Sequence, residues 1–151
     1  MKTPLLAHLA LALLLGTAPA VQAAAPVEAA APAAAEEKVV YHVNDSDNAF
    51  AALRNVQNHI NAAPDAKIVV VTHGKGIDFL LKNAEDKNGN PYEPAVQALK
   101  DKGVDFRVCN NTLKSRKLGA DAVIHEARIV PSGVAEVGRL QAKEGYVYLK
   151  P

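Results

Sequence analysis

The fold is decided by the stretch Ile68-Val69-Val70-Val71, four consecutive apolar residues with β-branched side chains. A strand with one face in solvent alternates apolar and polar residues, whereas this stretch is apolar at every position. We therefore expect a strand that is covered on both faces inside a parallel sheet, at the centre of the fold.

Strands and helices alternate on both sides of this stretch. Four more segments are predicted to be strands: 38–43, 104–109, 128–130 and 146–149. Between the strands, apolar residues at three- and four-residue spacing predict helices at 49–63, 77–81, around 95–99, after the turn 110–112 and at 134–140. This alternation predicts an α/β sandwich with a mostly parallel five-stranded sheet, although it does not determine the strand order.

Residues 1–23 are typical of a secretory signal peptide. Lys2 provides a positive start, a run rich in Leu and Ala extends from Leu5 to Leu15, and small residues suited to cleavage end at Ala23. A run of about 11 apolar residues is shorter than the roughly 20 that a spanning helix needs. We expect the signal to be cleaved, which leaves no membrane anchor and gives a periplasmic or secreted protein.

Residues 24–36 consist mostly of Ala and Pro and have no periodic apolar face. Such a composition cannot build a core, so we expect a disordered linker there. The folded domain is then expected to span residues 37–151.

Charge and cysteine content exclude several classes of function. The chain has 151 residues with 17 Lys and Arg against 16 Asp and Glu, a net charge of +1, so it lacks the basic excess of a nucleic-acid binder. One cysteine allows no disulfide within the chain and no multi-cysteine metal cluster. No nucleic-acid partner and no cofactor are expected, and any sulfur chemistry must use Cys109.

The candidate site residues lie at the ends of predicted strands. His42, His73 and Cys109 fall at or just after the ends of three strands, where ligands gather in open parallel sheets. If these strands are neighbours, the three side chains lie close together. Two other histidines, His59 and His125, are expected to face solvent.

Cys109 has two interpretations. A lone cysteine is most often a small buried hydrophobe. However, side-chain alternation places Cys109 with Asp105 and Arg107, on the face opposite the apolar residues of its strand. A helix that begins after Cys109, with Lys114 and Arg116 nearby, favours the nucleophilic thiolate. The polar face of this strand also suggests a sheet edge that meets a partner.

The segment Cys109-Asn110-Asn111-Thr112-Leu113-Lys114-Ser115-Arg116 resembles the one around the active cysteine of the DsrE/DsrF/TusD sulfur-relay family, also called YchN-like. The stretches 129–134 and 145–149 resemble the C-terminal half of that family, so the likeness covers roughly 38–151. The resemblance implies a three-layer α/β/α subunit that assembles as a homo-oligomer, often a trimer or hexamer. It also implies that Cys109 carries a persulfide between partner proteins.

The first hypothesis is therefore an exported protein that accepts sulfane sulfur on Cys109, from polysulfide or a sulfur-donor protein, as a carrier or a sulfurtransferase. The residues expected to hold the anionic donor are Arg107, Lys114, Arg116 and His73. The alternative is a non-enzymatic, homo-oligomeric module that binds a metal or small ligand at His42, His73 and Cys109, since two imidazoles and a thiolate suit zinc or copper. A third hypothesis is an oligomeric scaffold with an inert thiol.

Overall fold

The structure is a computed structural model that describes residues 36–151. The predicted signal peptide at 1–23, and all of the predicted linker at 24–36 except its last residue, lie outside the described residues. No helix in the described part of the chain has the length and hydropathy needed to cross a membrane.

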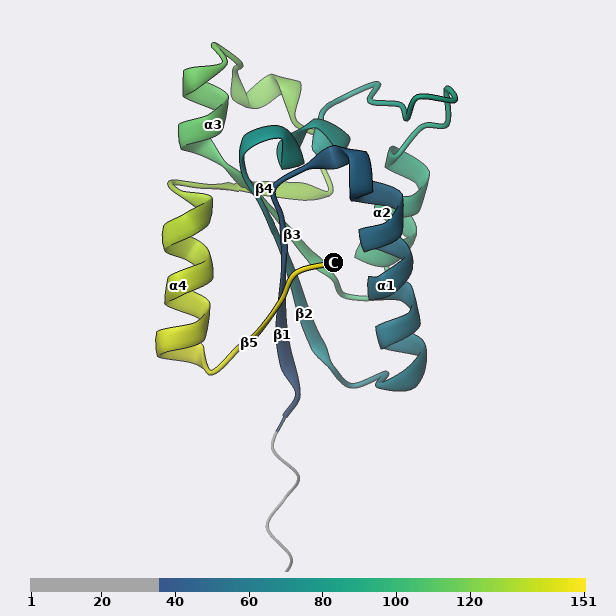
Figure 1. The fold of residues 1–151 in the computed structure, drawn as a ribbon, viewed down its shortest axis with the longest axis vertical. Coiled ribbons are helices and arrows are strands. Elements are labelled where there is room, and N and C mark those ends of the chain that lie inside the picture. Colours follow the sequence, from purple (N-terminus) through teal and green to yellow (C-terminus); the bar gives the residue numbers. More distant parts are fainter. Residues whose placement is uncertain (1–35) are drawn as a thin grey trace, which may run out of the picture. The chain divides into compact units, whose positions relative to one another are not determined.

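Five parallel strands form one sheet in the order β4-β3-β2-β1-β5 (Figure 1). They are β1 (Lys38–Val43), β2 (Lys67–Thr72), β3 (Asp105–Cys109), β4 (Ala127–Val130) and β5 (Val147–Leu149). The strand predicted to be central is β2, which pairs with β1 on one side and β3 on the other. The expected α/β fold with a five-stranded parallel sheet is confirmed.

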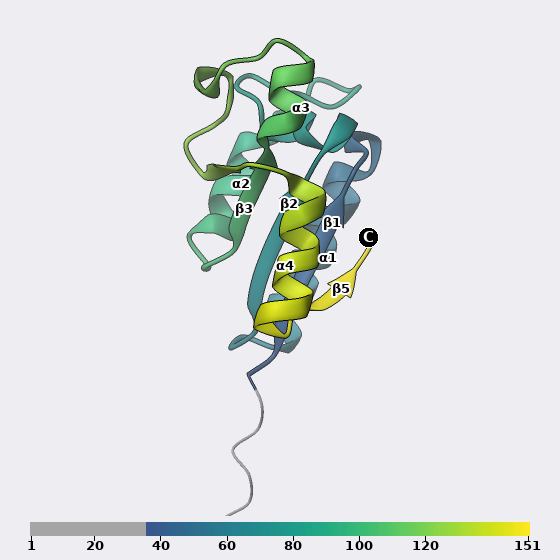
Figure 2. The ribbon, with the colours of Figure 1, turned by 90° about the vertical axis from the view of Figure 1, so that its left-hand side faces the viewer.

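Helices cover both faces of the sheet. The α-helices are α1 (Ala49–Ala62), α2 (Glu93–Lys100), α3 (Asn110–Ser115) and α4 (Gly133–Glu144), and the 3-10 helices are η1 (Ser46–Asn48), η2 (Gly74–Leu80) and η3 (Ala120–Ala122). Helices α1 and α2 lie on one side of the sheet and α4 on the other (Figures 1 and 2). The short helix expected at 77–81 begins earlier, at Gly74.

The alternation of β2 divides the core into two clusters. Ile68 and Val70 are buried in the larger cluster beneath α1 and α2. Val69 and Val71 point the other way, into a smaller cluster with Val137 and Leu140 of α4. Burial on both faces explains why this stretch is apolar at every position.

The sheet-edge interpretation of the third strand is wrong, because β3 lies between β2 and β4. Its polar residues face α4 and form ion pairs there. Arg107 has only 6% of its side chain exposed, and its guanidinium binds Asp105 at 2.7 Å and also Glu136 of α4. Arg128 of β4 binds the same Asp105 carboxylate at 2.9 Å. The polar face is thus a charge network covered by a helix.

His59 does not face solvent as expected, since only 15% of its side chain is exposed. Its Nδ1 lies 2.9 Å from the Tyr41 hydroxyl, and its Nε2 lies 2.7 Å from a Glu37 carboxylate oxygen. The last turn of α1 brings the ring against β1, where both partners are within reach. His125, in contrast, has 82% of its side chain exposed, as expected.

Candidate functional site at Cys109

Cys109 is the last residue of β3, and α3 begins at the next residue. The neighbouring strands β1 and β2 end at the same edge of the sheet, because all three strands are parallel. This edge is where ligand sites gather in open α/β sheets. The structure therefore places Cys109 at the type of position that the sequence predicted.

The start of α4 packs directly against Cys109. A Cβ atom built on Gly133 would lie 3.2 Å from the Cβ atoms of both Cys109 and His73, and 2.9 Å from the Thr72 carbonyl oxygen. Ser132 caps the helix, since its hydroxyl accepts a hydrogen bond from the Ala135 N–H at 3.4 Å. Glycine at this position lets the helix backbone approach the thiol closely.

The surroundings of Cys109 favour its thiolate. Cys109 is only 4% exposed. Burial is the largest single influence on the pKa of its thiol, and it raises that pKa. Hydrogen bonds from the Gly133 N–H, the Thr112 hydroxyl and the N–H groups of Thr112 and Asn111 together outweigh burial, so the net pKa is lowered. Backbone N–H groups at the starts of α3 and α4 thus stabilise the negative charge.

Thr112 connects this thiol to the loop after β2. Its hydroxyl oxygen accepts a hydrogen bond from the Gly74 N–H at 3.0 Å. A hydroxyl that accepts one hydrogen bond still has its own hydrogen to donate. The Gly74 contact therefore leaves the Thr112 hydrogen free to donate to Cys109.

The two histidines stack on each other beside the thiol. The ring centroids of His42 and His73 are 4.7 Å apart, and the His42 Nδ1 lies 2.8 Å from the Tyr148 hydroxyl. Burial lowers the pKa of His42, and the nearby His73 and Lys150 lower it further. His42 therefore favours its neutral form and adds little positive charge to the site.

The cations expected to hold an anionic donor occupy different environments. Arg107 is covered by α4 and already binds two carboxylates. Arg116 is exposed and forms an ion pair with Asp78 of η2. Lys114 lies exposed in the last turn of α3.

The histidines and the thiol are neighbours, but they do not form a compact ligand set. Among the residues that the structure describes, one group of three metal-binding side chains has ligand atoms within 4.8 Å of one another, and it consists of Glu93, His125 and Glu126. The sequence pattern does not predict this group. Glu93 starts α2 while His125 and Glu126 precede β4, and no spacing motif links them.

Comparison with known proteins gives a family and a fold. Residues 37–151 match the model of the DsrE/DsrF-like family. The structure is similar to that of MTH1491, a protein of unknown function from Methanobacterium thermoautotrophicum, with a TM-score of 0.69 and 28% identity over 77% of this chain and 100% of that one. It also resembles the ychN protein of E. coli in fold, with a TM-score of 0.64 and 13% identity over 76% of this chain and 99% of that one. No curated protein sequence matches the chain.

Proposed function

The chain belongs to the DsrE/DsrF-like family, and from the surroundings of Cys109 we propose that it binds or relays sulfane sulfur as a persulfide on this one cysteine. The observation that carries the proposal is that the pKa of the Cys109 thiol is lowered although the thiol is buried. Hydrogen bonds from Gly133, Thr112 and Asn111 lower it. An inert structural cysteine has no need of such donors, because burial alone keeps its thiol protonated.

The proposed step is an exchange between a thiolate and a persulfide. The Cys109 thiolate gives an electron pair to the outer sulfur of a persulfide or polysulfide and forms a new S–S bond. The S–S bond of the donor breaks, and its electron pair leaves with the inner sulfur as a thiolate or a shorter polysulfide. Sulfane sulfur moves without net oxidation, and delivery to an acceptor thiolate is the same step in reverse.

The N–H groups around Cys109 can stabilise both the reactant thiolate and the product persulfide. The thiolate and the persulfide are each anions, so donors that stabilise one also stabilise the other. Lys114, exposed in the last turn of α3, and Arg116, exposed and paired with Asp78, are the cations proposed to attract an anionic donor. His73 packs beside the same glycine as Cys109 and completes the proposed donor-binding surface.

We also propose a location and an oligomeric state for the protein. The signal-like sequence at residues 1–23 supports export to the periplasm or outside the cell, where polysulfide or an exported donor protein is the sulfur source. Family resemblance supports a homo-oligomer, a trimer or a hexamer.

The experiment that tests the thiolate is the rate of alkylation by iodoacetamide as a function of pH. The proposal predicts that the rate rises to its plateau at lower pH than for an unstructured cysteine peptide, because only the thiolate reacts. Cys109→Ser gives the background labelling. A thiol that titrates together with the peptide, or at higher pH, contradicts the proposal and favours a scaffold with an inert thiol.

A further inference from the structure

Glu126 is a buried carboxylate with too few partners. Its side chain is 2% exposed, and the one ion pair that the structure gives it joins Oε1 to the Nε2 of His125 at 3.0 Å. Its other oxygen, Oε2, is buried and has no hydrogen-bond partner among the described residues. A buried carboxylate is costly unless its charge and both oxygens are satisfied, so Glu126 points to a missing cationic partner.

Backbone hydrogen bonds anchor the segment that leads to Glu126. The Ile124 N–H donates to the Leu80 carbonyl at 3.1 Å, and the Lys82 N–H donates to the Ala122 carbonyl at 2.9 Å. These bonds tie the segment before β4 to the end of η2. The backbone that carries Glu126 is therefore anchored, and its side chain is 2% exposed.

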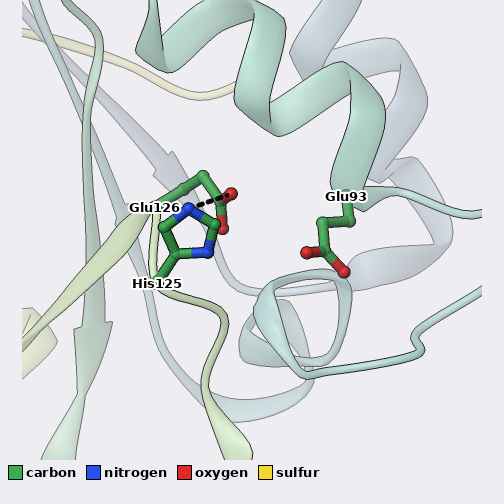
Figure 3. A group of neighbouring side chains, drawn as sticks. All are labelled: Glu93, His125 and Glu126. Atoms are coloured by element: carbon green, nitrogen blue, oxygen red, sulfur yellow. Dashed lines mark ion pairs between the residues drawn. The ribbon is translucent and has the colours of Figure 1, made fainter.

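Two other ligand-type side chains converge on Glu126. Glu93, the first residue of α2, and His125 each offer an atom within 4.8 Å of the others (Figure 3). Figure 3 shows the carboxylate of Glu126 turned toward the His125 ring, with the Glu93 carboxylate facing both across a gap. The gap belongs to a surface hollow of about 380 Å³ that Pro91 and Gln97 also line.

We propose that Glu93, His125 and Glu126 bind one divalent transition-metal cation, with zinc as the best match. One imidazole nitrogen and two carboxylates are ligands that zinc takes readily, and two negative charges neutralise a dication. Ligand atoms around tetrahedral zinc lie about 3.3 Å apart, so the site closes with a small shift of Glu93 and His125, both exposed. The hollow leaves room for water as a fourth ligand.

This site is separate from the one at Cys109. Glu93 belongs to α2, on the side of the sheet covered by α1 and α2, whereas Cys109 faces α4. No residue is shared between the two sites. A test of metal binding at Glu126 is therefore independent of a test of persulfide chemistry at Cys109.

The test is a zinc titration of the full chain in a Cys109→Ser background, in competition with a chromogenic chelator, since a free thiolate also binds zinc. We expect one zinc per chain. His125→Ala, Glu126→Gln and Glu93→Gln should each weaken binding by about tenfold or more, because removal of even an outer-sphere partner costs that much in known metal sites. Glu85→Gln, an exposed glutamate in the loop before α2, is the matched control and should bind zinc like the parent.

Thermal unfolding with zinc and with EDTA provides a second readout. Zinc should raise the melting temperature of the parent and of Glu85→Gln, and this rise should vanish in His125→Ala, whose exposed ring is not needed for folding. Comparing each variant with and without metal removes any direct effect of Glu126→Gln on stability. Folded parent protein that takes up no stoichiometric zinc, or zinc binding that survives loss of His125 and Glu126 unchanged, overturns the proposal.

Discussion

Gly133 lies so close to Cys109 that a side chain on Gly133 has no space: its Cβ would stand 3.2 Å from the Cys109 Cβ. The same Cβ would be 2.9 Å from the Thr72 carbonyl oxygen, which belongs to the rigid central strand. The close approach of α4 is also what lets the Gly133 N–H stabilise the thiolate. The packing of one glycine thus connects the fold to the chemistry of the thiol.

Gly133→Ala is predicted to push the start of α4 away from the sheet. Overpacking of this kind costs about 1–3 kcal/mol of unfolding free energy. Because the N–H donor moves with the helix, the pKa of Cys109 should rise and alkylation at neutral pH should slow. Urea denaturation and iodoacetamide kinetics measure the two effects.

Gly138→Ala is the matched control in the same helix. A Cβ there would meet no atom within 4 Å, and Gly138 is exposed in the middle of α4. Alanine should therefore stabilise the protein by about 0.5–1 kcal/mol through helix propensity and leave the thiol reactivity unchanged. Equal effects of the two substitutions on alkylation would show that the Gly133 contact does not matter.

Thr112→Val should raise the pKa of Cys109, because it removes the hydroxyl that hydrogen-bonds to the sulfur. Alkylation at neutral pH should become severalfold slower, with the plateau rate at high pH unchanged. Thr112→Ser restores a hydroxyl and should restore the parent profile. If Val and Ser variants titrate alike, the hydroxyl does not act on the thiolate.

The charge network under α4 predicts how stability depends on pH. Burial is the largest single influence on Asp105 and raises its pKa. Hydrogen bonds from Arg128 and Arg107, and the charges of both, together lower the pKa by more than burial raises it, so the net pKa is lowered. A hydrogen bond from Arg139, with help from Arg107, lowers the pKa of Glu136 against opposing burial. Both carboxyls therefore bind protons less readily in the folded state than in the unfolded chain.

It follows that the contribution of these two carboxylates is fully present above their ordinary pKa of about 4, and is lost as the pH falls through the lowered values. Arg107→Met should reduce this acid-dependent part and destabilise the fold by about 1.5–3 kcal/mol at neutral pH, because Asp105 and Glu136 each lose one of their two cationic partners and keep only Arg128 and Arg139. Denaturation curves from pH 7 to 2 test both effects. Arg54→Met, at an exposed position of α1, is the control, and an identical pH profile in both variants would contradict the network's role.

The edge strand β5 supports the proposal of a homo-oligomer. Val147 is 61% exposed and Leu149 37% exposed on a strand that pairs with β1 alone among the described strands. Exposed apolar residues on a sheet edge favour association with another chain. Light scattering should give the mass of a trimer or hexamer, and Val147→Lys should reduce it. A mass of one chain at high concentration would argue against any stable oligomer.

Much of the fold was predictable because its signals are local. The apolar stretch in β2 and the turn residues between elements are set by short-range periodicity and by side-chain burial. The position of Cys109 at a strand end followed from the same reasoning. The features that local patterns do not predict depend on tertiary contacts. The polar face of β3 suggests a sheet edge in the sequence, because no local pattern reveals that Glu136 of α4 covers Arg107.

The rest of the candidate site depends on pairs distant in sequence. Gly133 reaches Cys109 because β4 runs beside β3 and its end brings the first residue of α4 to the end of β3. Glu93 begins α2 and Glu126 precedes β4, with β3, α3 and η3 between them in the chain. The burial of Glu126 leaves no sign in the sequence, where it follows an exposed histidine. Such contacts arise from tertiary packing, and the spacing of residues in a single sequence does not predict them.

The central claim is tested most directly by the intact mass of the protein after incubation with polysulfide at neutral pH. A persulfide on Cys109 predicts a gain of one sulfur atom per chain, about 32 Da, that cyanide or a reductant reverses. Cys109→Ser should gain nothing while keeping its circular dichroism spectrum, because serine removes the nucleophile and nearly preserves the volume. A parent protein that never gains this mass, with a thiol that is alkylated no faster than a free peptide cysteine, would contradict persulfide chemistry at Cys109.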